Sequence, residues 1–171
     1  MYASGGCSLG RSSAKCDSTL NGYLDELQSG TDISVLAFRW DANFEEEEFL
    51  TELDQLVRTA QEKSKKVIVM AQPPLLTFSP AKIENCNRLG IPCYKPEESI
   101  DDLYPAYNDT IKARVAALGV EFFDPYTNIS DRSQLYKGDQ LLYSDTDHLS
   151  VYGGRWLYEN VADQGPALLQ H

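Results

Sequence analysis

The chain has 171 residues, with 15 Lys and Arg against 26 Asp and Glu for a formal net charge of −11. This acidic balance argues against binding to nucleic acid or to an anionic membrane surface, because both need clustered Lys and Arg. Hydrophobic residues make up 42% of the chain, which is enough for a packed core, and no apolar run approaches the ~18 residues of a membrane span. We therefore expect a folded domain that does not itself cross a membrane.

The four cysteines form two closely spaced pairs, Cys7/Cys16 and Cys86/Cys93. Neither pair has the CxxC spacing of redox and zinc sites, and one His inside the chain offers few partners for zinc. We predict no metal site. The pairs favour two short disulfides and hence an oxidising compartment. The alternative is reduced surface thiols in the cytosol.

The first half of the chain predicts two helices and one strand. Leucines at helical spacing indicate a helix over residues 18–29, which Gly30 ends. The β-branched and apolar run 33–38 predicts a strand that is buried on both faces. Glu45–Glu48 then place negative charge where a helix dipole favours it, and an apolar face follows through Ala60. We therefore interpret this acidic run as a solvated helix start and not as a metal site.

The second half repeats the alternation. Residues 66–71 predict another buried strand, which Gln72-Pro73-Pro74 ends. The stretch of about 30 residues that follows the strand, with six prolines and the second cysteine pair, predicts a long functional or disulfide-tied loop. Residues 107–118 indicate a helix, and residues 120–123 indicate a third strand. The last helix should begin near Ser150.

This alternation predicts an α/β fold, a three-layer α/β/α sandwich with a central parallel sheet. Active sites in such sheets gather at the carboxyl ends of the strands. The segments after Phe38, Ala71 and Phe123 are therefore the places where we expect functional residues.

The strongest candidate for chemistry is the pair Asp145 and His148, just before the last helix. At this spacing the carboxylate can accept a hydrogen bond from one ring nitrogen and hold the other toward a substrate hydroxyl, as in a hydrolytic triad. Histidine also titrates near the working pH of a general base. The alternative is that an Asp or Ser here, Asp147 or Ser150, caps the helix, and for Asp147 we expect that structural role.

The string DTDHLSVYGG around this pair resembles the last block of the SGNH/GDSL hydrolases, whose Asp-x-x-His supplies two triad members. More narrowly, the chain resembles the SGNH domain fused to bacterial membrane acyltransferases of the acyltransferase 3 type. The matching features are a cysteine pair before a strand that ends in Arg39-Trp40, the turn Gln72-Pro73-Pro74, a second cysteine pair and the Asp-x-x-His-Leu-Ser block. The likeness spans about residues 7–160.

The resemblance implies a flavodoxin-like SGNH fold and one domain over residues 1–171 that lacks its first strand and the following helix. That strand carries the Gly-Asp-Ser nucleophile of the family, so we expect the nucleophilic serine outside this chain. Ser12 follows no apolar run, and Ser4 has no Gly-x-Ser-x-Gly elbow. Alone, the chain is expected to be inactive.

The implied function is O-acyl transfer, acetyl transfer above all, or ester hydrolysis on a bacterial cell-surface polysaccharide. His148 would be the base and Asp145 its orienter, with no cofactor. Arg39 and Trp40 would bind the oxyanion or a sugar; the alternative is an Arg paired with Asp41 and a Trp in the core.

The expected partners are a glycan acceptor, an acyl donor and an N-terminal transmembrane acyltransferase domain of the same protein, and the expected location is periplasmic or extracytoplasmic. A non-catalytic glycan-binding or docking module is the alternative function. A cytosolic esterase with free thiols is a third.

Overall fold

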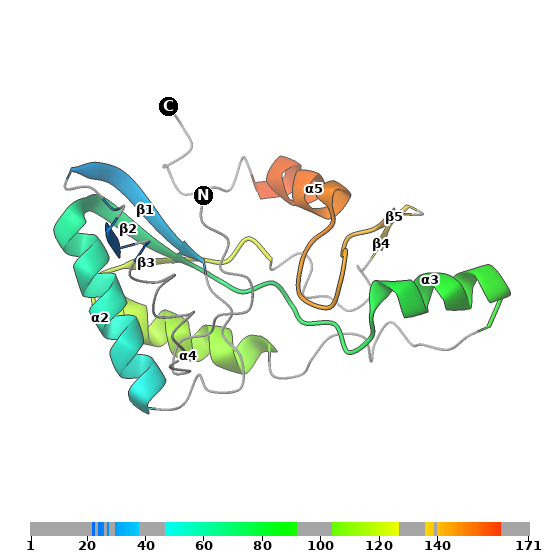
Figure 1. The fold of residues 1–171 in the computed structure, drawn as a ribbon, viewed down its shortest axis with the longest axis horizontal. Coiled ribbons are helices and arrows are strands. Elements are labelled where there is room, and N and C mark those ends of the chain that lie inside the picture. Colours follow the sequence, from blue (N-terminus) through cyan, green and yellow to red (C-terminus); the bar gives the residue numbers. More distant parts are fainter. Residues whose placement is uncertain are drawn as a thin grey trace. The chain divides into compact units, whose positions relative to one another are not determined.

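A computed structural model gives the fold of the chain. It describes Gly22, Leu24, Asp25, Leu27 and residues 30–37, 47–91, 104–126, 136–138 and 140–161. The strands are β1 (Thr31–Ala37), β2 (Ser64–Met70), β3 (Glu121–Phe123), β4 (Tyr136–Lys137) and β5 (Gln140–Leu141). The helices are α2 (Glu47–Lys63), α3 (Pro80–Leu89), α4 (Tyr104–Ala117) and α5 (Val151–Val161) (Figure 1).

The chain divides into two compact units. Unit 1 consists of Met1–Gln72 and Pro105–Phe123, and unit 2 consists of Pro73–Tyr104 and Asp124–His171. Unit 1 contains the three-stranded sheet with α2 and α4, whereas unit 2 contains α3, α5 and the β4–β5 hairpin. None of the described helices combines the length and the apolar character that a membrane crossing requires.

The sheet of unit 1 is parallel, in the order β1-β2-β3. Its register pairs Val35 with Ile68 and Met70 with Phe123. Three consecutive residues of β2, Val67 to Val69, are buried, as expected for a strand covered on both faces. The same expectation is wrong for β1, because Val35 is 51% exposed while Ser34 and Leu36 are buried. β1 lies at one end of the described strand order, and in this strand the face with Ser34 and Leu36 is buried while the face with Val35 is exposed.

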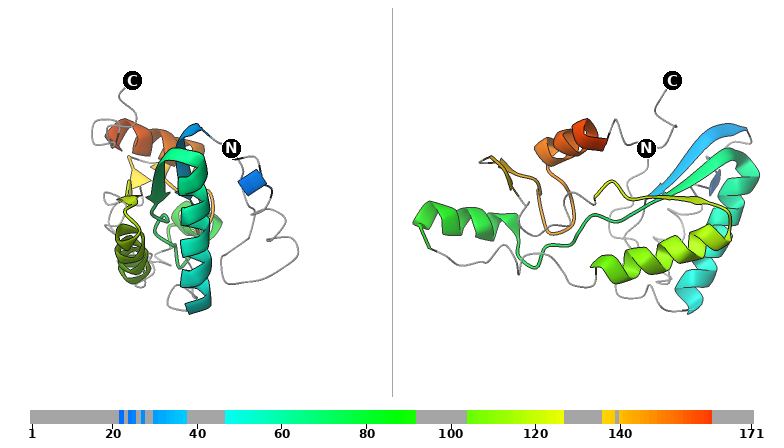
Figure 2. Two further views of the ribbon diagram at one scale, coloured as in Figure 1. Left: turned by 90° about the vertical axis from the view of Figure 1, so that its left-hand side faces the viewer. Right: turned by 180° about the vertical axis from the view of Figure 1, so that it is seen from behind.

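The two crossover helices of unit 1 cover the same side of the sheet (Figure 1, Figure 2). Right-handed crossovers that step in one direction, from β1 to β2 to β3, place both helices on one face. Arg114 of α4 forms a two-pronged ion pair with Asp54 of α2, at 2.7 and 2.9 Å, which links the helices side by side. The apolar face predicted for α2 is buried and comprises Phe49, Leu53, Leu56, Val57 and Ala60. These findings confirm the α/β class.

Helix α3 lies inside the stretch that we expected to be a loop. Ser79 precedes it, and the Ser79 carbonyl accepts hydrogen bonds from the amides of Lys82 and Ile83, which begins the first turn at Pro80. Gly90 has a φ of +64° and ends the helix. Proline at the first helical position and glycine just after the last are general helix signals. Pro80 therefore starts this helix and does not exclude it.

The carboxyl end of β2 carries buried polar groups. The Asn108 Oδ1 of α4 accepts a hydrogen bond from the Gln72 amide at 3.3 Å. The side-chain nitrogen and oxygen of Gln72, and Asn108 Nδ2, are buried without a hydrogen-bond partner. Unit 1 therefore retains unsatisfied amide groups at the end of a strand, where such sheets have their functional residues.

Candidate functional site

The segment from Leu142 to Ser150, which we call the His148 loop, is closed at its base by antiparallel pairing within unit 2. Tyr143 and Leu149 form an isolated β-bridge, the Ser144 amide donates to the His148 carbonyl at 2.9 Å, and the Ser150 amide donates to the Leu142 carbonyl at 2.8 Å. The turn between them carries the predicted catalytic pair. Its backbone is thus fixed by hydrogen bonds at both ends.

Two hydrogen bonds attach the His148 loop to the segment that follows β2. The Leu76 amide donates to the Thr146 carbonyl at 2.7 Å, and the Tyr143 hydroxyl donates to the Pro74 carbonyl at 2.9 Å. Proline has no amide hydrogen, but its carbonyl remains a full acceptor. The Pro73-Pro74 turn therefore helps to anchor the loop through its backbone.

Helix α5 begins immediately after the loop and packs against it. Ser150 Oγ accepts a hydrogen bond from the Gly153 amide at 2.9 Å, which is the N-cap interaction. Ser150 is therefore the residue that caps α5, as one of the two sequence-based alternatives predicted. The prediction that Asp147 caps this helix is wrong. A Cβ on Gly153 would lie 1.9 Å from the Leu142 carbonyl oxygen, so this position requires glycine.

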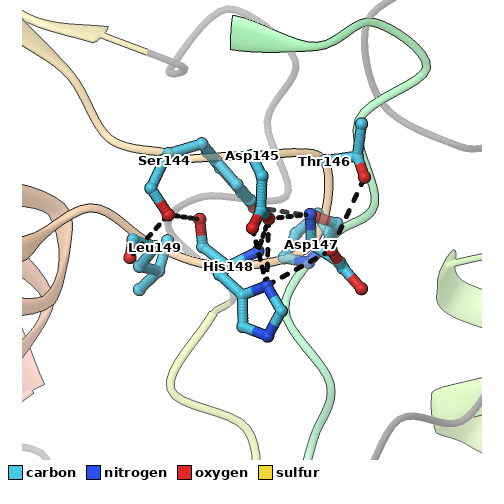
Figure 3. Close-up of polar contacts among 8 residues, drawn as sticks. Ser144, Asp145, Thr146, Asp147, His148 and Leu149 are labelled. Atoms are coloured by element: carbon cyan, nitrogen blue, oxygen red, sulfur yellow. Dashed lines mark hydrogen bonds and ion pairs between the residues drawn. The ribbon is translucent and has the colours of Figure 1, made fainter. Parts of the chain in front are cut away.

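Asp145 and His148 are in direct contact (Figure 3). His148 Nδ1 lies 3.0 Å from Asp145 Oδ1 and 2.9 Å from Oδ2. Asp145 Oδ1 also accepts the amides of Asp147, at 3.0 Å, and His148, at 2.7 Å. One carboxylate therefore fixes the local backbone and orients the ring.

The charge of Asp145 is stabilised by these donors. Desolvation works toward raising the pKa of its carboxyl group, but the hydrogen bonds from the Asp147 and His148 amides and from the imidazole outweigh it, so that the pKa is lowered from 3.8. Asp145 is consequently ionised across the neutral pH range. An ionised carboxylate is an acceptor only, and it selects the imidazole form with its proton on Nδ1.

The other ring nitrogen, Nε2, points away from the carboxylates in Figure 3. The His148 side chain is 73% exposed. With Nδ1 protonated and held by Asp145, Nε2 has a lone pair available to accept a proton from a hydroxyl group. This arrangement is chemically suited to general-base catalysis.

A comparison with protein families matches residues 1–163 to the family described as "SGNH domain (fused to AT3 domains)". The chain belongs to this SGNH family. Among solved structures, the SGNH domain is similar to "Structure of Salmonella ser. Paratyphi A lipopolysaccharide acetyltransferase periplasmic domain", with 13% sequence identity and a TM-score of 0.67. The alignment covers 88% of this chain and 61% of the Salmonella chain. No curated protein matches in the sequence search.

At this identity the structural likeness concerns the fold alone, and it agrees with the expected SGNH-type fold. The chain spans less than two thirds of the Salmonella chain that it matches. Arg39 and Trp40, the candidates for binding the oxyanion or a sugar, lie outside the described residues. The same holds for three of the cysteines and for the two serines that the sequence argued against as nucleophiles, namely Cys7, Cys16, Cys93, Ser4 and Ser12. Their roles in the SGNH domain stay predictions.

Cys86 lies on α3, is buried and does not have a free thiol. Its pairing with Cys93, and that of Cys7 with Cys16, lies outside the described residues and stays a prediction. Within unit 2, Cys86 and Ile83 share the buried face of α3.

Asp145, Asp147 and His148 offer three ligand-type atoms within 4.8 Å of one another. Asp145 and His148 are exposed, Asp147 is partly buried, and Nδ1 of the ring is engaged by Asp145. Exposed acidic groups at such distances are common without a metal ion. The hydrogen-bonded histidine and carboxylate pair accounts for the arrangement.

Sequence reasoning missed the place of Asp147. Its carboxylate Oδ1 lies 3.3 Å from His148 Nδ1, on the same side of the ring as Asp145 (Figure 3). The only sequence signal was an acidic residue next to the histidine, which does not reveal the direction of its side chain.

Proposed function

We propose that the SGNH domain provides the histidine and aspartate of a Ser-His-Asp unit that O-acetylates a bacterial cell-surface polysaccharide. The observation that carries the proposal is the contact of His148 Nδ1 with both oxygens of Asp145, which leaves Nε2 as the proton acceptor. The nucleophilic serine is proposed to come from outside these 171 residues, as the family resemblance implies.

The proposed reaction has two halves. In the first, His148 Nε2 takes the proton of the serine hydroxyl while the serine oxygen attacks the carbonyl carbon of the acyl donor. The tetrahedral intermediate then collapses, and the donor group leaves with the proton from Nε2. Asp145 stabilises the imidazolium that exists between these two proton transfers.

In the second half, an acceptor hydroxyl attacks the acyl-serine, and His148 Nε2 takes the hydroxyl proton. The intermediate collapses, the acyl group remains on the acceptor, and the serine regains its proton. A sugar hydroxyl as acceptor gives transfer, whereas water gives hydrolysis. Arg39 and Trp40 remain candidates for binding the oxyanion or the sugar.

The acceptor and the location are inferred from the comparisons. The family is described by its fusion to AT3 domains, and the structural neighbour is a periplasmic domain of a lipopolysaccharide acetyltransferase. Both support an extracytoplasmic domain that works with a transmembrane acyltransferase domain of the same protein. That membrane domain would supply the acyl donor, and the acceptor would be a surface glycan such as lipopolysaccharide.

The test uses the full-length protein in a bacterial host whose polysaccharide acetylation is measured by NMR spectroscopy. We expect His148→Ala to abolish acetylation and Asp145→Asn to lower the rate by about 10²- to 10⁴-fold. Glu159→Gln, which removes one negative charge from the exposed side of α5, should leave acetylation unchanged. Full acetylation by His148→Ala at wild-type protein levels would contradict the proposal.

The isolated chain tests where the nucleophile lies. We expect the 171-residue chain to be inactive on p-nitrophenyl acetate. Robust activity that His148→Ala abolishes would place the nucleophile within the chain. Glycan binding by the isolated chain, together with acetylation that does not depend on His148, would instead favour the non-catalytic module.

A further inference from the structure

A second carboxylate faces Nδ1 of His148. Asp147 Oδ1 lies 3.3 Å from that nitrogen, beside the Asp145 oxygens at 2.9 and 3.0 Å. The side chain of Asp147 is only 17% exposed, whereas that of Asp145 is 54% exposed. The more enclosed of the two acids is therefore the one for which the sequence predicted a cap and no part in the chemistry.

Local hydrogen bonds fix Asp147 beside the ring. Its amide donates to Asp145 Oδ1 at 3.0 Å, and the Thr146 hydroxyl donates to its Oδ1 at 3.5 Å. An enclosed carboxylate needs such donors to offset its lost hydration. The Nδ1–H group of His148 is a further donor within reach, on the face of the ring that Figure 3 shows turned toward both acids.

We propose that Asp147 is a positioning residue that acts with Asp145 to keep the His148 proton on Nδ1, so that Nε2 stays the proton acceptor. This inference rests on the proposed function for its catalytic consequence, but the positioning itself does not depend on that function. Both carboxylates can only accept hydrogen bonds, so both oppose the imidazole form that carries its proton on Nε2. Among the described residues, Asp145 and Asp147 are the ionisable groups in contact with the ring.

The positioning is tested directly by ¹⁵N NMR of the imidazole nitrogens in the 171-residue chain at a pH where His148 is neutral. The His171→Gln background leaves His148 as the only histidine. We expect the wild-type ring to carry its proton on Nδ1, Asp147→Asn to increase the share with the proton on Nε2, and Asp145→Asn to increase it further. Glu159→Gln is the charge-matched control and should change nothing.

An unchanged share in Asp147→Asn would overturn the inference. Asp147→Glu, which keeps the charge, should restore much of the wild-type share. The amide spectrum of each variant shows whether the His148 loop remains folded, and a change in the ring that persists with an intact loop supports positioning.

Kinetics in the full-length protein provide the second measurement. We expect Asp147→Asn to lower kcat about fivefold to tenfold, as for the loss of one charge 3.3 Å from the ring nitrogen in a water-like dielectric, with KM unchanged. Asp147→Glu, which keeps the charge, should restore most of kcat. A loss in Asp147→Glu as large as that in Asp147→Asn would show that the charge of Asp147 does not act on His148.

The two measurements separate the failures. If His148→Ala leaves acetylation intact, the proposed function is wrong, and the NMR result alone decides the role of Asp147. If acetylation depends on His148 but Asp147→Asn leaves the share of imidazole with its proton on Nε2 unchanged, the proposed function stands and the positioning role is wrong.

Discussion

Replacement of Gly153 by alanine tests whether the His148 loop and α5 are locked together. The added Cβ would lie 1.9 Å from the Leu142 carbonyl oxygen and 2.8 Å from the Leu142 carbonyl carbon. Ordinary contacts begin at 3.4 Å, so the helix or the carbonyl must move by about 1.5 Å. That carbonyl accepts the Ser150 amide at 2.8 Å, so the movement would disturb the base of the loop.

The neighbouring Gly154 supplies a matched control. It lies in the same helix, and a Cβ there would meet nothing within 4 Å. Alanine in a helix interior is more favourable than glycine by about 0.5–1 kcal/mol, so Gly154→Ala should raise the free energy of unfolding by that amount. Overpacking costs about 1–3 kcal/mol, so Gly153→Ala should lower the free energy of unfolding, with a fall in Tm of about 2 to 12 °C.

The assay is urea denaturation followed by circular dichroism, with amide NMR of residues 142–150 as a local probe. We expect Gly153→Ala to shift the resonances of Leu142 and Ser150 and Gly154→Ala to leave them in place. Equal stabilisation by both substitutions would refute the close approach, and with it our explanation of why position 153 requires glycine.

Three further predictions concern single groups. The pKa of the Asp145 carboxyl group is lowered below 3.8, so its contribution to stability is present above pH 3.8 and is lost as the pH falls through the folded pKa. The amide exchange of His148 should therefore speed up in acid in the wild-type chain, and Asp145→Asn should remove this dependence on pH. Burial, and secondarily the charge of Asp124, raises the pKa of Tyr126 above 10.0, so its contribution is present below pH 10.0 and is lost at higher pH. Tyr126→Phe should therefore reduce the loss of stability in urea titrations repeated at increasing alkaline pH, and an unchanged loss would contradict this. Gln72→Met should raise the free energy of unfolding by about 1 kcal/mol in urea denaturation, because its buried amide has no partner; a fall would show that the amide is satisfied, for example by a buried water.

Local sequence was sufficient wherever the deciding interactions are between near neighbours in the chain. The strand and helix alternation of unit 1 follows from apolar periodicity, and the contact of Asp145 with His148 follows from a spacing of three residues. The start of α5 after Ser150 follows from capping. Helix α3 could also have been predicted, since Ser79-Pro80 and Gly90 are ordinary helix signals, but the density of prolines concealed them.

Interactions between distant segments could not be predicted in this way. The exposed face of β1 depends on its place at one end of the sheet order, although its apolar sequence resembles that of the buried strand β2. The anchoring of the loop through Thr146 and Tyr143 joins residues about 70 positions apart in the chain. No periodicity in a single sequence reports such pairings.

The sequence by itself determined the α/β class, the family resemblance and the identity of the histidine and aspartate pair, because these depend on residue type and short spacing. The tertiary structure alone decided that Asp147 turns toward His148 and that Gly153 meets the Leu142 carbonyl. Both depend on how a turn is folded back on itself. The direction of a side chain and the closeness of two backbones are set by that folding and not by the order of the residues along the turn.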